Sequence, residues 1–245
     1  MKNYPIRICV LGTVGSGKTS LCSRYVNNFM EPVYRKSDES ARFRKVVQLN
    51  QGDEMITRMV VIDDVIGINH PFLTEDDDNE HIHFFNYVLE NTRKKDIITH
   101  NKLYKERPAN VYFFLFDLTD ESSFDDLAEI IIYISSKEER DSSKKNFNPC
   151  LKYLVATKSD ALFQEINNGF RDKIDKCKKK FKLEVVQVSA FSNENVEELF
   201  RDALLEAMDR DVRNFRLERE SARRAGKEPG LWCNCRENNP SCQLI

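Results

Sequence analysis

The chain has 245 residues, of which 40% are hydrophobic and 32% charged, and its formal net charge is −2. This length suits one α/β domain with extensions, although two small domains would also fit. The weak net charge argues against a general nucleic-acid binder, and the sequence has no run of about 18 apolar residues that would predict a transmembrane helix. Because the N-terminus leads straight into an apolar strand, we expect no signal peptide.

The seven cysteines are an odd number, and Cys9 and Cys22 fall on elements that we expect to be buried. A disulfide framework is therefore disfavoured, and a reducing cytosol is the expected compartment. Cys233, Cys235 and Cys242 lie close together, but their spacing matches none of the usual zinc patterns.

Residues 12–19, with the sequence GTVGSGKT, fit the phosphate-binding pattern G-x-x-x-x-G-K-[ST] in full. Residues 6–11 before it predict a buried strand, and residues 20–26 after it predict the first turns of a helix. In this context the glycines let backbone N–H groups face phosphate oxygens, and the helix N-terminus attracts the anion. We expect Lys18 to reach the β- and γ-phosphates and the Thr19 hydroxyl to ligate Mg²⁺. The residues predicted to hold the nucleotide here are Gly12, Val14, Gly15, Ser16, Gly17, Lys18, Thr19 and Ser20.

A polar loop at 29–40 precedes two predicted strands, 42–49 and 55–62, which a turn at 50–53 joins as an antiparallel edge pair. The second strand delivers Asp64-Val65-Ile66-Gly67, a D-x-x-G pattern. Alone this pattern is weak. After a phosphate loop, however, Asp64 is placed to hold Mg²⁺ through water, and the Gly67 N–H is placed to touch a γ-phosphate.

The continuous apolar run at 111–116 predicts a central parallel strand. Ser122 is the predicted N-cap of the following helix, which runs through residues 130–132 and gives way to a charged loop at 138–147. The remaining expectations are strands at 151–156 and 184–188, a lysine-rich helix ending near Lys182, and a last helix from near Asn195.

Residues 70–108 interrupt this alternation and are interpreted as an insertion. The four histidines are scattered without convergent carboxylates, so we favour solvated histidines over a metal site. We therefore expect a domain at 1–210, followed at 211–245 by a helical extension and a flexible tail.

Five motifs follow strand ends in this order: the phosphate loop, a hydroxyl-bearing loop, D-x-x-G, Thr157-Lys158-Ser159-Asp160 and Ser189-Ala190-Phe191. This order resembles the Ras superfamily of small GTPases over about residues 5–210. The resemblance implies a P-loop NTPase α/β fold, with a six-stranded, mostly parallel sheet flanked by helices. It also implies that GTP or GDP binds with Mg²⁺ at the strand ends.

Within this resemblance, Asp160 accepts from the N1–H and the amine of guanine, a donor pair that adenine lacks. Thr157 stands where most members have Asn, although Thr also occurs in Rho-like members. Lys158 is expected to lie along the base, and Phe29 or Met30 is expected to cover the base edge. The backbone N–H of Ala190, the residue after Ser189, is expected to meet the guanine oxygen. Asp160 also disfavours the alternative of an ATP-using P-loop enzyme.

Catalytic roles are implied for Lys18, Ser37 and Gly67, and Mg²⁺ ligation for Thr19, Ser37 and Asp64. Three departures from the family pattern bear on hydrolysis. Ile68 stands at the place of the water-positioning Gln, Val14 stands at the place of a common Gly, and the insertion comes shortly after Ile68. We therefore expect slow GTP hydrolysis, which Ile68→Gln would accelerate. The alternative is a hydrolysis-deficient GTP-binding module controlled by exchange or expression.

Cys242-Gln243-Leu244-Ile245 forms a C-a-a-X box, so Cys242 is the expected prenylation site. Because one lipid gives only marginal attachment, a second signal is expected, from palmitoylation of Cys233 and Cys235 or from arginines after residue 210. We expect a lipid-anchored monomer on the cytoplasmic side of a membrane. Effectors and exchange factors are expected to bind through residues 31–43 and 64–75.

Overall fold

The computed structural model describes residues 5–31, 33, 40–51, 54–68, 109–141, 150–161 and 166–224. The chain divides into two units, residues 1–207 and residues 208–245. The first unit contains the sheet and its covering helices. The described part of the second unit is the continuation of helix α5 (Val196–Arg224), whose sequence spans the boundary.

The sheet has six strands in the order β2-β3-β1-β4-β5-β6. Strand β2 (Ala41–Gln51) pairs antiparallel with β3 (Glu54–Asp64), whereas every other neighbouring pair is parallel. The remaining strands are β1 (Ile6–Gly12), β4 (Val111–Asp117), β5 (Leu151–Thr157) and β6 (Glu184–Gln187). This arrangement confirms the predicted fold class and the antiparallel edge pair.

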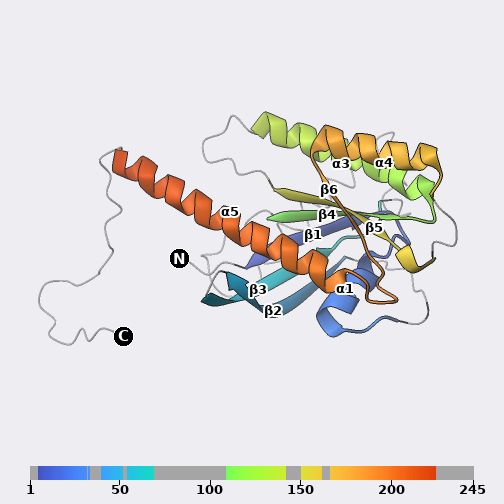
Figure 1. Cartoon of the computed structure of the whole chain (residues 1–245), viewed down its shortest axis with the longest axis horizontal. Coiled ribbons are helices and arrows are strands. Elements are labelled where there is room, and N and C mark those ends of the chain that lie inside the picture. Colours follow the sequence, from blue (N-terminus) through green and yellow to red (C-terminus); the bar gives the residue numbers. More distant parts are fainter. Residues whose placement is uncertain are drawn as a thin grey trace, which may run out of the picture. The chain divides into compact units, whose positions relative to one another are not determined.

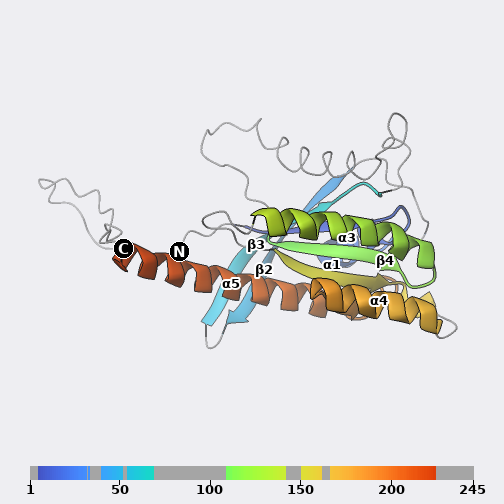
Figure 2. The same ribbon diagram turned by 90° about the horizontal axis from the view of Figure 1, so that it is seen from above.

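Helices cover both faces of the sheet. Helix α3 (Glu121–Asp141) and helix α4 (Asn168–Phe181) lie side by side over one face (Figures 1 and 2). Helix α1 (Lys18–Asn27) and the first turns of α5 cover the other face, where Tyr25 stacks on Phe200 with ring centroids 3.7 Å apart.

Strand β4 shows why the centre of the sheet is apolar. Side chains alternate between the two faces of a strand, so Phe113 meets Phe200 edge-on, whereas Phe116 meets Phe124 of α3. Phe113, Phe114 and Phe116 are fully buried. Each such ring stabilises the fold by about 1.5–3 kcal/mol, because its apolar surface is removed from water. The predicted central strand is therefore confirmed.

Two local expectations were wrong. Helix α3 begins at Glu121, and the Asp120 carboxylate accepts hydrogen bonds from the Ser122 N–H (3.1 Å) and hydroxyl (2.7 Å), so Asp120 caps the helix. The ionised carboxylate is a stronger acceptor for helix N–H groups than a hydroxyl. Helix α3 also extends to Asp141, because Glu and Arg after residue 137 favour helix over the predicted loop.

The parallel strands bring their carboxyl ends to one edge of the sheet. The register sets Val10 of β1 beside Asp64 of β3, and Asp117 of β4 beside Thr157 of β5. Every motif that the sequence analysis singled out within the described residues follows one of these strand ends. The site is therefore built at this edge.

Candidate functional site

The phosphate loop joins β1 to α1 and has a shape that only glycine permits at two points. A Cβ on Gly12 would lie 2.4 Å from the Leu115 carbonyl oxygen, and Gly17 has a φ of +86°. Ser16 closes the turn by donating its hydroxyl to the Thr13 carbonyl at 2.9 Å. These restraints hold the loop in one curled conformation, which suits a phosphate group cradled by backbone N–H groups.

Lys18 is buried across this loop. Its Nζ donates to the Thr13 carbonyl at 2.7 Å and to the Gly12 carbonyl at 3.1 Å. Burial lowers the pKa of Lys18 to about 8, although the nearby Asp64 charge opposes that shift. A cation with so little solvation has a strong electrostatic preference for an anionic ligand, as a phosphate-binding lysine requires.

Thr19 and Asp64 form the candidate metal site. The Thr19 hydroxyl donates to Asp64 Oδ2 at 2.7 Å, whereas Asp64 Oδ1 is buried and has no hydrogen-bond partner among the described residues. Burial raises the pKa of Asp64, while the Thr19 hydrogen bond and the Lys18 charge lower it. A buried orphan carboxylate oxygen beside a hydroxyl fits the oxygen ligands that Mg²⁺ requires. The described residues contain no group of three His, Cys, Asp or Glu that would form a protein-only metal cage.

The D-x-x-G segment packs tightly against the phosphate loop. A Cβ on Gly67 would lie 2.5 Å from Val14 Cγ2 and 2.6 Å from the Val14 backbone nitrogen, so glycine is required there. The Ile68 N–H donates to the Gly12 carbonyl at 3.2 Å. The Ile68 side chain is only 3% exposed and belongs to the apolar cluster under α3 and α4. Ile68 therefore faces the core instead of the space above the phosphate loop.

This packing corrects part of the predicted partner surface. Residues 64–68 are all buried, so they are unavailable to an effector. The cause is the aliphatic sequence Val65-Ile66-Gly67-Ile68, which places Val65, Ile66 and Ile68 in the core. Residues 41–43 are at least partly accessible, whereas residues 34–39 and 69–75 lie outside the described part of the chain.

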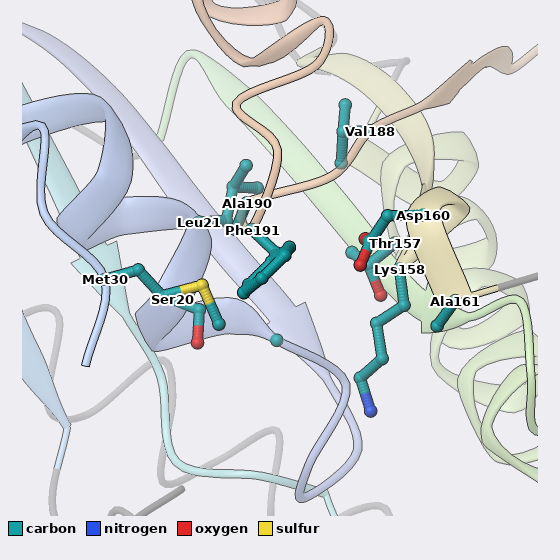
Figure 3. Close-up of a pocket in the computed structure, with 11 residues that line it drawn as sticks. Ser20, Leu21, Met30, Thr157, Lys158, Asp160, Ala161, Val188, Ala190 and Phe191 are labelled. Carbon is teal, nitrogen blue, oxygen red and sulfur yellow. The ribbon is translucent and has the colours of Figure 1, made fainter. Parts of the chain in front are cut away.

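A pocket opens beside the loop, between α1 and the segments that follow β5 and β6 (Figure 3). The motif residues Thr157, Lys158, Asp160 and Ala190 line it, together with Met30 from the α1–β2 connection. Asp160 Oδ1 accepts from the Ser189 hydroxyl at 2.5 Å, and the carboxylate is exposed. The full lining is Gly17, Ser20, Leu21, Met30, Thr157, Lys158, Asp160, Ala161, Val188, Ala190 and Phe191. Apolar walls with one presented carboxylate suit a flat heterocycle that carries N–H donors.

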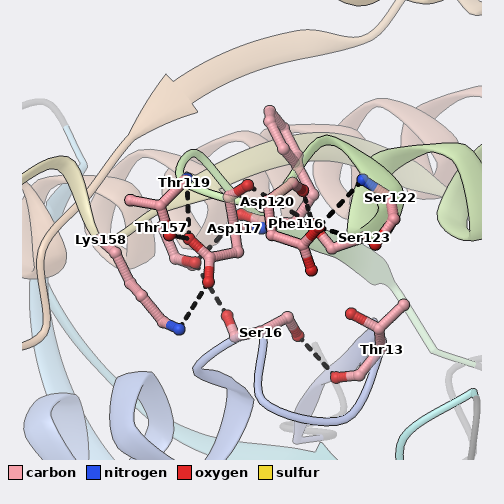
Figure 4. A network of polar contacts seen from close by, with 10 residues as sticks. All are labelled: Thr13, Ser16, Phe116, Asp117, Thr119, Asp120, Ser122, Ser123, Thr157 and Lys158. Carbon is pink, nitrogen blue, oxygen red and sulfur yellow. Dashed lines mark hydrogen bonds and ion pairs between the residues drawn. The ribbon is translucent and has the colours of Figure 1, made fainter. Parts of the chain in front are cut away.

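Asp117, which the sequence analysis missed, connects this pocket to the phosphate loop. Its buried carboxylate pairs with Lys158 Nζ at 2.5 Å and accepts from the Thr119 N–H and hydroxyl (Figure 4). Thr157 completes the connection by donating its hydroxyl to the Ser16 carbonyl at 2.8 Å. Lys158 has a φ of +58°, which is unusual for lysine, and the ion pair helps to hold that backbone conformation. The position of Asp117 at the carboxyl end of a buried strand was the signal available in the sequence.

Comparison with protein families gives one match. The Ras family model matches residues 98–209, a range that includes the Thr157–Asp160 and Ser189–Phe191 motifs, whereas the phosphate loop precedes it. The match covers just under half of the chain and supports a small GTPase of the Ras superfamily. A comparison with curated proteins returned no match. Members of this superfamily bind guanine nucleotides and act as switches through effectors and exchange factors, and the pocket residues Thr157, Lys158, Asp160 and Ala190 lie within the matched range.

Three expectations rest on residues outside the described part of the chain. Ser37, Cys242 and the insertion at 70–108, with its histidines, are not described. The described cysteines, Cys9, Cys22, Cys150 and Cys177, are free thiols. No helix among the described residues is long and apolar enough to cross a membrane.

Proposed function

We propose that this small GTPase binds GTP or GDP with Mg²⁺ and acts as a signalling or trafficking switch with slow intrinsic hydrolysis. It is held at the cytoplasmic side of a membrane by prenylated Cys242. Nucleotide binding, the first part of this proposal, is supported by one observation: Lys18, the Thr19–Asp64 pair and the Asp160 pocket lie at one edge of the sheet. One nucleotide can engage all three.

Different residues of the chain would contact the phosphates, the metal ion and the base. Lys18 exchanges its carbonyl contacts for phosphate oxygens, while the loop backbone and the N-terminus of α1 supply N–H donors. Thr19 and Asp64 would hold Mg²⁺, which supplies charge neutralisation between the β- and γ-phosphates when it is bound. Asp160 selects guanine, and Lys158 is held beside the base by Asp117.

Asp64→Asn tests the metal assignment. The change removes a buried negative charge with little change of shape, and the amide oxygen still accepts from Thr19. We expect Mg²⁺ affinity of the GDP complex to fall about 10–100-fold or more. Because the folded-state pKa of Asp64 is raised, its ionised form destabilises the metal-free protein. The variant is therefore expected to melt higher than the native protein when Mg²⁺ is chelated.

The readout is GDP release with and without a chelator, beside thermal unfolding of both proteins. Asp172→Asn, an exposed carboxylate on α4, is the matched control and should behave as the native protein. If chelation accelerates GDP release equally in the native protein and in Asp64→Asn, Asp64 is not a metal ligand.

Slow hydrolysis follows from what faces the γ-phosphate position. No side chain of the described segment 65–68 offers a hydrogen bond there, since Ile68 is in the core and Gly67 is pressed against Val14. Val14 also occupies space that an arginine finger would need. The same observations favour the alternative, a hydrolysis-deficient GTP-binding module controlled by exchange or expression. A single-turnover assay distinguishes slow hydrolysis from none.

Membrane attachment rests on the C-a-a-X sequence alone, and Cys242 lies outside the described residues. Cys242→Ser is expected to move the protein from the membrane to the soluble fraction of cells, because no prenyl group can then be added. A Cys233→Ser, Cys235→Ser double variant is the control, and it should only weaken retention. A Cys242→Ser protein that still sediments with membranes would show that the anchor lies elsewhere.

A further inference from the structure

Arg24 makes contacts that neither the phosphate loop nor the base motif accounts for. It lies on α1, and its guanidinium donates from Nε to the Ala190 carbonyl at 2.7 Å and from Nη2 to the Phe191 carbonyl at 3.3 Å. Nη1 donates to the Asn28 carbonyl at the end of the same helix, also at 3.3 Å. One side chain thus holds two consecutive carbonyls of the turn that lines the base pocket.

The same turn is fixed on its other side. Ser189 and Glu194 exchange backbone hydrogen bonds at its base, and the Ser189 hydroxyl donates to Asp160. The Ser192 N–H donates to the Ser189 hydroxyl at 3.0 Å. Among the described contacts of this turn, the hydrogen bonds from α1 reach the tip, at the carbonyls of Ala190 and Phe191. Figure 3 shows this tip between the α1 residues Ser20 and Leu21 and the segment that carries Lys158 and Asp160.

The backbone N–H groups of Ala190 and Phe191 have no acceptor among the described residues, although both carbonyls are bound. In a trans peptide the C=O and N–H groups point in opposite directions. Fixing the Ala190 carbonyl against α1 therefore fixes the Phe191 N–H away from α1. Fixing the tip as a whole limits the directions open to the Ala190 N–H.

We propose that Arg24 is a positioning residue for base recognition, which holds the Ala190–Phe191 turn so that its free N–H groups meet the guanine oxygen. The proposal rests on the proposed guanine nucleotide function. Arginine suits this role because its planar fork donates in several fixed directions at once, whereas a lysine ammonium provides a single point of charge. The contact to Asn28 also ties the turn to the segment that leads to Met30, on the opposite wall of the pocket.

The experiment compares GDP with 6-thio-GDP, a guanine analogue that keeps the N1–H and the amine but carries sulfur, a weaker acceptor, in place of the C6 carbonyl oxygen. Affinities are measured for the native full-length protein, Arg24→Met and Arg24→Lys. The native protein should bind GDP about tenfold more tightly than the analogue, since the oxygen accepts from the turn. In both variants this ratio should fall to about two or less, with analogue affinity nearly unchanged.

Arg201→Met, which removes an exposed arginine from α5, is the control and should keep the native ratio. The proposal is overturned if Arg24→Met keeps the native ratio, if it weakens GDP and the analogue equally, or if the native protein does not distinguish the two. Thermal unfolding of the GDP complexes verifies that the variants are folded. ADP is included as a separate arm, because equal native affinity for GDP and ADP would instead refute the guanine function.

Discussion

Replacing Asp160 by asparagine is expected to weaken binding of GTP and GDP by about 10³-fold, the largest effect of any single change in the base pocket. The carboxylate would accept two charge-assisted hydrogen bonds from guanine, which together contribute about 4 kcal/mol, or three powers of ten in affinity. The asparagine amide presents donors where guanine also has donors. Xanthine has a carbonyl at that position, so the variant should gain affinity for xanthine nucleotides.

Equilibrium competition against a fluorescent GDP derivative gives the affinities of the native and variant proteins for guanine, xanthine and adenine diphosphates. Asp172→Asn again serves as the control, because it removes a carboxylate on α4 that does not line the pocket. If Asp160→Asn binds GDP as tightly as the native protein does, the carboxylate does not read the base. In the native state Asp160 is already oriented by Ser189, so little ordering should accompany binding.

Ile68→Gln is expected to destabilise the protein without accelerating hydrolysis. From sequence alone the opposite result is expected, because glutamine is the usual water-positioning residue at this place. In the structure, however, the Ile68 side chain is 3% exposed within the apolar cluster. A glutamine there loses apolar burial and leaves a buried amide unpaired, which together cost about 3 kcal/mol. For a domain of this size that loss lowers the Tm by roughly 6–12 °C.

The measurement is thermal unfolding of the GDP complex together with single-turnover GTP hydrolysis. Ile68→Leu, which keeps the volume and apolar character, should change the Tm by much less and leave hydrolysis unchanged. A glutamine variant that melts as the native protein does and hydrolyses GTP faster would show that residue 68 turns out of the core when GTP is bound.

The fold was predictable from the sequence because its strands carry strong local signals. The apolar run at 111–116 predicts a buried strand of a parallel sheet, and the glycine-rich loop after residues 6–11 predicts the turn from a strand to a helix. Strand ends then locate the site, since motif residues that follow parallel strands share an edge. Lys18, Thr19, Asp64 and Asp160 were placed in this way.

The residues that support those groups were not predictable in the same way. Arg24 contacts a turn 166 residues further along the chain, and nothing local in α1 indicates that contact. The burial of Ile68 likewise depends on α3 and α4 covering that face, so the pattern D-x-x-G followed by an aliphatic residue could not reveal its direction. Long-range packing decides both cases.

We propose that the site is complete for guanine nucleotide binding and poorly equipped for turnover. The most direct test is to load the protein with equal amounts of GTP and ATP, remove free nucleotide, and identify the bound nucleotide by chromatography over several hours. We expect about one guanine nucleotide per chain, no adenine nucleotide, and conversion to GDP slower than the half-hour half-life that a Ras intrinsic rate of about 3–5 × 10⁻⁴ s⁻¹ gives. Retention of ATP alongside GTP, or complete conversion to GDP within minutes, would contradict the account.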